Sequence, residues 1–139
     1  MTKTSKSNSR GQGIVEFTLV LPLLLVLVGG ATDWGLGFFV SHVVQNASRE
    51  GARIAVTLPN LTANDARVLA AVNSKIPGIS LFSGFTVTST TPAGPLCGQE
   101  VTVQVAGSYS FSFLRLLGFT TIPISRATTM RYELQQPCA

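Results

Sequence analysis

One carboxylate in this 139-residue chain stands where it could do chemistry. Glu16 lies at the start of a long apolar run that follows a short basic stretch. A lone carboxylate at the entrance to a membrane helix is costly unless it has a partner, so Glu16 is a functional candidate. The alternative is that Glu16 lies among the lipid headgroups, where the positive end of a helix favours an acid. The residue types alone leave both interpretations open.

Side chains suited to catalysis are otherwise scarce. His42 is the one histidine, and no nucleophile with an accompanying base stands out. No spacing of ligands indicates a metal site. The glycines at 35 and 37 do not form a phosphate loop, because no strand precedes them. We therefore expect a protein that is not an enzyme and has no metal or cofactor.

The two cysteines, Cys97 and Cys138, could form one disulfide if they face an oxidising compartment. That link would tie a loop between two strands to the C-terminus, and the chain-entropy model assigns roughly 3–4 kcal/mol to it. We expect the disulfide, because nothing else in the sequence holds the tail. Two free thiols are the alternative.

Composition narrows the class of protein. Charged residues make up 12% of the chain and apolar residues 45%, which argues against a disordered chain and against an ordinary cytosolic enzyme. The net charge is +4, but Lys3, Lys6 and Arg10 supply three of the ten cations. The rest of the chain is nearly neutral, so a nucleic-acid partner is not expected.

A membrane span is expected at about residues 17–39. Residues 17–32 carry no charge, and about 20 residues cross the hydrocarbon core. Asp33 would then lie near the far interface, beside an aromatic anchor. That anchor is formed by Trp34, Phe38 and Phe39. The basic N-terminus favours a single-pass protein of the cytoplasmic membrane, with its N-terminus in the cytoplasm and its C-terminal part outside.

Two features of the span concern its shape and packing. Pro22 would break a helix in water, whereas in a membrane it more often produces a kink. Four glycines make the helix narrower in the second half of the span, because they have no side chains. They either form a face for close packing or reflect the general abundance of glycine in membrane helices. These glycines are Gly29, Gly30, Gly35 and Gly37.

The helical pattern continues beyond the membrane. An apolar stripe at three- and four-residue spacing extends to residue 58, before Pro59, and predicts one continuous helix over residues 12–58. The run 46–53 contains off-stripe polar residues that form either a docking face for a partner or a solvated surface. These residues are Asn46, Arg49, Glu50 and Arg53. Ala47 and Gly51 are expected to let a strand or helix pack closely.

The remaining residues, 59–139, are expected to form an extracytoplasmic module. Residues 62–75 predict a short helix capped by Thr62. Its packing face is expected to comprise Ala66, Leu69, Ala70 and residues 73–76. Alternating residues then predict strands at 85–90, at 101–106 with an extension to 113, and at 122–132. The expected class is α+β, with a sheet of three or four antiparallel strands after the long helix.

The sequence GQGIVEF at residues 11–17 is similar to the processing site of type IV prepilins of the Tad (Flp) class. In that class a prepilin peptidase cuts after the glycine and leaves an acid at the fifth position. The resemblance therefore implies a leader of residues 1–11, a cut between Gly11 and Gln12, and Glu16 as residue five. It also implies that Glu16 pairs with the new amino group of a neighbouring subunit.

A longer pattern resembles the TadE-like family of minor pilins. It comprises the opening from Gly11 to Pro22, the pair Asp33 and Trp34, and the run NASREGAR at 46–53. The resemblance implies a pilin-like fold and a role in pilus assembly, secretion or adhesion. Its implied partners are prepilin peptidase, other pilin subunits, the Tad inner-membrane assembly platform and membrane lipid. An uncleaved single-pass scaffold or adhesion protein is the alternative, and a secreted protein with a cleaved signal peptide is less favoured.

Overall fold

The structure is a computed structural model that describes residues 10–76, 78, 80–91 and 98–132. Cys97 and Cys138 lie outside the described residues, and so does the disulfide expected between them. Most of the expected leader, residues 1–9, also lies outside them.

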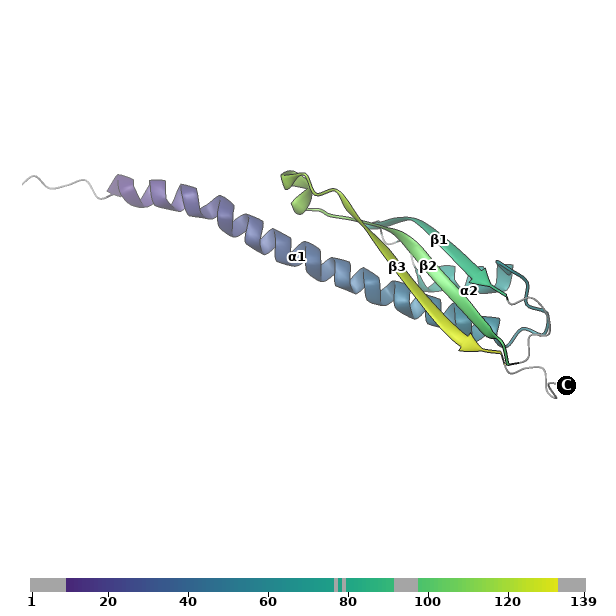
Figure 1. Cartoon of the computed structure of the whole chain (residues 1–139). Coiled ribbons are helices and arrows are strands. Elements are labelled where there is room, and N and C mark those ends of the chain that lie inside the picture. Colours follow the sequence, from purple (N-terminus) through teal and green to yellow (C-terminus); the bar gives the residue numbers. More distant parts are fainter. Residues whose placement is uncertain (1–9, 77, 79, 92–97, 133–139) are drawn as a thin grey trace, which may run out of the picture.

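One long helix dominates the chain. Helix α1 runs from Arg10–Ala55, and its N-terminal half extends away from the rest of the protein (Figure 1). Residues 11–28 of α1 are all exposed. The helix continues through Pro22, which has no N–H to donate to the carbonyl of Thr18. Within the described residues, α1 is the one helix long and apolar enough to cross a membrane.

Helix α1 ends at Ala55, three residues before the end that the apolar stripe predicted. The chain tightens there, because Thr57 and Leu58 donate their N–H groups to carbonyls three residues back. Pro59 follows and cannot continue a helix. The Tyr132 hydroxyl donates to the carbonyl of Leu58 and so joins this turn to the end of the last strand.

The second helix, α2, runs from Ala66–Lys75 and begins later than predicted. Asp65 caps it by accepting the N–H of Arg67 at 2.9 Å, so the expected cap at Thr62 was wrong. The expected packing face was wrong in part. Ile76 is buried as expected, whereas Ala66 and Ala70 are exposed. The buried face also contains Val68 and Val72, which were not expected there and which are spaced by four from each other and from Ile76.

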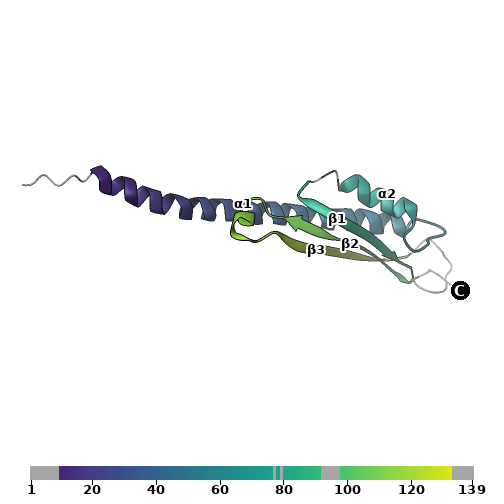
Figure 2. The same cartoon turned by 90° about the horizontal axis from the view of Figure 1, so that it is seen from above.

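Three antiparallel strands form one sheet in the order β1-β2-β3. They are β1 (Phe82–Thr90), β2 (Glu100–Ser110) and β3 (Thr121–Arg131). The α+β class predicted from the sequence is confirmed, with the smaller of the two expected strand numbers. The sheet covers the outer half of α1, and α2 packs on α1 beside it (Figure 2).

The core lies between α1 and the central strand. Val101, Val103 and Val105 alternate along β2 and are fully buried, as their period predicted. Across from them, Val40, Val44 and other small residues of α1 are buried. The alternation was expected to continue to Phe113, but β2 ends at Ser110. A 3-10 turn, η1 (Leu114–Leu117), follows and turns the chain back into β3.

We call residues 111–120 the tip. The tip lies at the end of the sheet that faces the N-terminal half of α1, and it contacts the middle of that helix (Figure 1). It ends the globular part of the protein on this side. Beyond it, α1 continues alone.

Candidate functional site

The residues of the expected processing site lie in the first turns of α1. Gly11, Gln12 and Glu16 are all exposed there. A Cβ atom added at Gly11 or at Gly13 would meet nothing within 4 Å. No other described residue of the chain covers this end of the helix, so it is open to a partner.

Asp33 joins the long helix to the tip. Its side chain is fully buried although it lies in the second half of the expected span. The carboxylate accepts the backbone N–H groups of Ser112 at 3.0 Å, Phe113 at 2.8 Å and Leu114 at 2.7 Å. The carbonyl of Asp33 also accepts the hydroxyl of Tyr109 at 2.9 Å. Four hydrogen bonds thus hold the end of β2 and the start of η1 on one residue of α1.

This carboxylate replaces the capping groups that η1 lacks. The residue before η1, Phe113, makes no side-chain capping bond. Backbone N–H groups at the start of a helical turn have no partner within the turn, so a buried start needs an acceptor from elsewhere. Asp33 supplies that acceptor. The acid near the end of the span is therefore a structural clamp for the tip.

Glycines of α1 allow the tip to approach. A Cβ atom on Gly29 would lie 2.8 Å from Cβ of Phe113, and one on Gly37 would lie 3.5 Å from the ring of Tyr109. At Gly30 the same atom would make ordinary contact with Leu114, and at Gly35 it would meet nothing. Gly29 therefore serves close packing, one of the two interpretations of these glycines. The surface that packs against it is the tip of the same chain.

The predicted aromatic anchor is exposed on α1. Trp34, Phe38 and Phe39 are each more than half exposed. Trp34 meets Phe111 of the tip edge to face, with ring centroids 6.1 Å apart. Trp34 therefore lies where the tip joins the helix.

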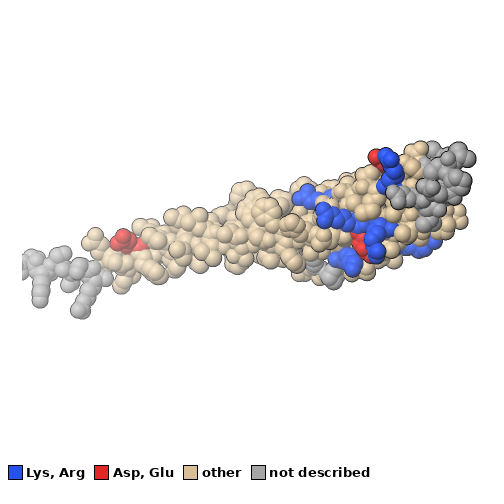
Figure 3. Space-filling model, turned by 90° about the horizontal axis from the view of Figure 1, so that it is seen from below, with Lys and Arg blue, Asp and Glu red and all other residues tan. Residues whose placement is uncertain are grey.

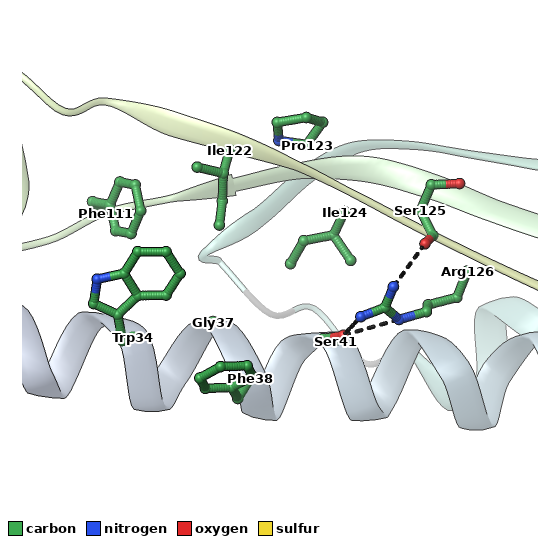
Figure 4. Close-up of a pocket in the computed structure, with 10 residues that line it drawn as sticks. All are labelled: Trp34, Gly37, Phe38, Ser41, Phe111, Ile122, Pro123, Ile124, Ser125 and Arg126. Atoms are coloured by element: carbon green, nitrogen blue, oxygen red, sulfur yellow. Dashed lines mark hydrogen bonds between the residues drawn. The ribbon is translucent and has the colours of Figure 1, made fainter.

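A cavity of about 290 Å³ opens beside Trp34, between α1 and β3 (Figure 4). Its walls are mostly apolar, and Arg126 lies at one end. The guanidinium of Arg126 donates to the Ser41 hydroxyl from two nitrogens, at 3.0 and 2.6 Å, and to the carbonyl of Ser125 at 3.3 Å. Arg126 thus bridges the edge strand and α1.

The run 46–53 divides into an outer and an inner face. Asn46, Arg49 and Arg53 are exposed, and Arg53 forms a two-pronged ion pair with Glu50 at 3.1 and 3.2 Å. This pairing lowers the pKa of Glu50, chiefly through the hydrogen bond from Arg53. A pair of this kind on a surface contributes little to stability. The two interpretations of the outer face, docking and solvation, both remain compatible with it.

The inner face of the same run is packed tightly. Gly51 lies under α2 and β2, where an added Cβ would be 2.6 Å from Cγ2 of Val72 and 3.0 Å from Cγ1 of Val103. Ala47 is fully buried on the same face. The close packing of a helix and a strand expected at these two small residues is present.

Sequence reasoning missed several contacts of α1 with the sheet. Ser48 shares a hydrogen bond of 2.8 Å with Thr128, and Gln45 donates to Thr128 at 3.2 Å. The contact of the apolar segment 114–119 with α1 was not predicted either. A run of large apolar residues in a turn between strands is the signal that could have indicated it.

Residues suited to holding a metal ion do not gather in the part of the chain that the structure describes. Within it, no three His, Cys, Asp or Glu side chains lie close enough together to bind one. His42 is exposed on α1 beyond the expected span.

Comparison with known proteins finds one family model that matches part of the chain. The family model described as "TadE-like protein" matches residues 11–53, which is nearly the whole of α1. The match confirms the predicted resemblance over this helix. No curated protein and no solved structure matches the chain.

Proposed function

Starting from the TadE-like helix of residues 11–53, we propose that this protein is a minor pilin or pseudopilin of a Tad-type pilus. Its long helix holds the subunit in the cytoplasmic membrane and later in a filament. The sheet and α2 form the module outside the membrane. The role is one of structure and assembly, in pilus formation, secretion or adhesion, and involves no catalysis.

The feature that best supports this proposal is the exposed N-terminal half of α1. Residues 11–28 are mostly apolar, and all of them are exposed. Such a surface needs to be covered by lipid or by other helices. A subunit that passes from a membrane into a helical filament core would use both kinds of cover in turn.

Processing is the second part of the proposal. Prepilin peptidase would cut between Gly11 and Gln12, which removes the basic leader and places an amino group at the start of α1. Glu16 then lies about 6 Å along the helix from Gln12, by the rise per residue. A buried carboxylate and a buried ammonium are each costly alone and tolerable as a pair. Glu16 would pair with the Gln12 amine of an adjacent subunit, with other pilins and the assembly platform as its partners.

The experiment that tests the proposal is an N-terminal sequence and intact mass of the membrane-bound full chain. It is expressed with and without a prepilin peptidase. We expect a start at Gln12 only when the peptidase is present. A chain that keeps residues 1–11 in its native host would contradict the proposal and indicate an uncleaved membrane-anchored scaffold or adhesion protein.

A matched pair of glycine variants controls for folding. Gly11→Leu places a large side chain at the cleavage position, and Gly13→Leu places the same side chain two residues later. Both positions have open space around them, so both variants should insert and fold alike. We expect Gly11→Leu to block cleavage and Gly13→Leu to retain the start at Gln12. Cleavage of Gly11→Leu at the normal site would contradict recognition of this glycine.

A further inference from the structure

The tip exposes large apolar side chains at the end of the module nearest the free half of α1. Leu116 is 88% exposed and Phe119 is 61% exposed. Phe113 and Leu117 are each about half exposed. An apolar group of this kind at one end of a domain marks a surface that something covers.

The position of the tip along α1 indicates what covers it. The tip packs beside Gly29 and closes a small apolar hollow against Leu25 and Val26. These residues belong to the uncharged run 17–32. With Glu16 at one boundary, a hydrocarbon core of about 30 Å extends for about 20 residues, to near Leu36. Gly29 then lies about 10 Å inside the outer boundary.

The backbone of the tip suits an environment without water. Buried or lipid-facing N–H groups need acceptors within the protein. Asp33 accepts those of Ser112, Phe113 and Leu114. The N–H groups of Leu116, Gly118 and Phe119 bond to carbonyls within the tip itself. The turn closes at Gly118, whose φ of 92° favours glycine.

The scarcity of charged residues in the tip also suits an environment without water. The tip sequence FSFLRLLGFT contains one charged residue, Arg115, whose long side chain can reach back to the headgroups. On the face seen in Figure 3, basic side chains gather over the outer part of the module, and the surface of the N-terminal half of α1 is largely uncharged.

We propose that the tip inserts its apolar side chains into the outer leaflet of the membrane that α1 crosses. The tip and the helix then form two adjacent membrane contacts, joined by Asp33. Lipid acyl chains occupy the exposed faces of Phe113, Leu116, Leu117 and Phe119. The module is thereby fixed against the bilayer rather than suspended above it. This inference rests on α1 spanning a membrane, which is part of the proposed function, but not on a role in a pilus.

Fluorescence quenching in lipid tests the proposal, because the chain has one tryptophan, Trp34. The full chain with Trp34→Phe receives one new tryptophan and is placed in phosphatidylcholine nanodiscs with brominated acyl chains. Leu116→Trp reports on the tip, Leu25→Trp on the span, and Asn60→Trp on the far end of the module. All three positions are exposed, so the new side chain has room.

We expect a blue-shifted emission and strong quenching by the brominated lipid for Leu116→Trp and Leu25→Trp. For Asn60→Trp we expect quenching only by aqueous iodide. Quenching of Leu25→Trp with an iodide-accessible Leu116→Trp would overturn the tip insertion and leave the span intact. Absence of lipid quenching at both positions would overturn the inference together with its premise.

A second copy of this chain is the competing cover for the tip. Nanodiscs that hold a single copy separate the two cases. We expect the quenching of Leu116→Trp by brominated lipid to be unchanged at one copy per disc. A lipid-shielded signal that appears only when several copies share a disc would overturn lipid as the occupant.

Discussion

The backbone N–H of Leu114 donates a hydrogen bond of 2.7 Å to the carboxylate of Asp33, 81 positions earlier in the chain. Phe113 donates to the same oxygen at 2.8 Å, and Ser112 donates to the other oxygen at 3.0 Å. A carboxylate is the side chain that can accept all three, because both of its oxygens are acceptors only. These three hydrogen bonds therefore set the position of the tip relative to α1.

Replacement of Asp33 by asparagine should loosen the tip. One of the two acceptor oxygens becomes an amide NH₂, which faces backbone donors and leaves at least one of them without a partner. We expect the free energy of unfolding of the outer module to fall by about 1–3 kcal/mol. Hydrogen exchange at Ser112, Phe113 and Leu114 in detergent should become faster than elsewhere in the sheet.

A control for this variant is Glu100→Gln at the exposed start of β2. It removes one negative charge without removing an acceptor from the tip, and exchange at the tip should stay at the wild-type rate. Equal protection of the tip amides in Asp33→Asn and in the wild type would contradict the clamp.

The sequence carried enough information for the separate elements but not for the clamp. The uncharged run and the stripe beyond it predict α1, and the alternation around Val103 predicts β2. Both signals are local. The hydrogen-bond partners of Asp33 lie about 80 residues away in the sequence. No local pattern indicates which apolar segment packs against which part of α1, so the position of the tip could not be predicted. The face of α2 was a different failure, because Val68 and Val72 already showed the spacing of four that buries them.

Gly29 and Gly30 offer a matched test of how closely the tip approaches α1. Gly29→Ala places a Cβ 2.8 Å from Cβ of Phe113, which is closer than two such atoms can approach. Gly30→Ala places it 3.5 Å from a methyl group of Leu114, an ordinary contact distance. We expect Gly29→Ala to displace the tip and to raise hydrogen exchange at Phe113, and Gly30→Ala to leave it unchanged. Identical exchange in the two variants would show that the tip does not rest on Gly29.

Among the glycines of α1, Gly51 should tolerate an added side chain least, because it packs against α2 and β2. Gly51→Ala brings a methyl group to 2.6 Å from Val72 and 3.0 Å from Val103. We expect a loss of about 1–3 kcal/mol in the free energy of unfolding, as for other overpacked cores. Chemical denaturation followed by circular dichroism of the sheet measures it.

The second substitution Val72→Ala tests the cause of that loss. It makes room for the new methyl group, so the double variant should lose less than the sum of the two single variants. Gly35→Ala, where an added Cβ meets nothing within 4 Å, should not lower stability. If the losses in the free energy of unfolding from the two substitutions were strictly additive, the destabilisation by Gly51→Ala would not arise from contact with Val72.

Asp65 should give the outer module a pH-dependent stability. Hydrogen bonds from the Arg67 side chain, followed by the Arg67 backbone N–H, lower the pKa of Asp65. The folded state therefore binds fewer protons than the unfolded state in acid, and the stabilisation is fully present above about pH 4, the ordinary range of this group. It is lost as the pH falls below that value. The midpoint of urea unfolding, measured as a function of pH, should fall there.

Asp65→Asn removes the titrating group and keeps a side chain able to cap α2. Its stability should be lower than that of the wild type at pH 7, and the difference should shrink in acid. Arg67→Gln should reduce the same pH dependence in part, because the backbone N–H of residue 67 still bonds to Asp65. A difference between Asp65→Asn and the wild type that stays constant from pH 7 to acid would contradict this assignment.

Glu16 should be needed for assembly and not for membrane insertion. Its side chain is exposed at the start of α1, so Glu16→Gln keeps the size of the residue, the helix and the apolar run while removing the charge. We expect normal insertion, normal cleavage at Gly11 and a strong loss of incorporation into filaments, because the new amino group of a neighbour loses its counter-charge. Glu16→Asp keeps the charge and should retain part of the incorporation. Immunoblots of sheared filaments and of membranes measure the two pools, and wild-type amounts of Glu16→Gln in filaments would refute the pairing.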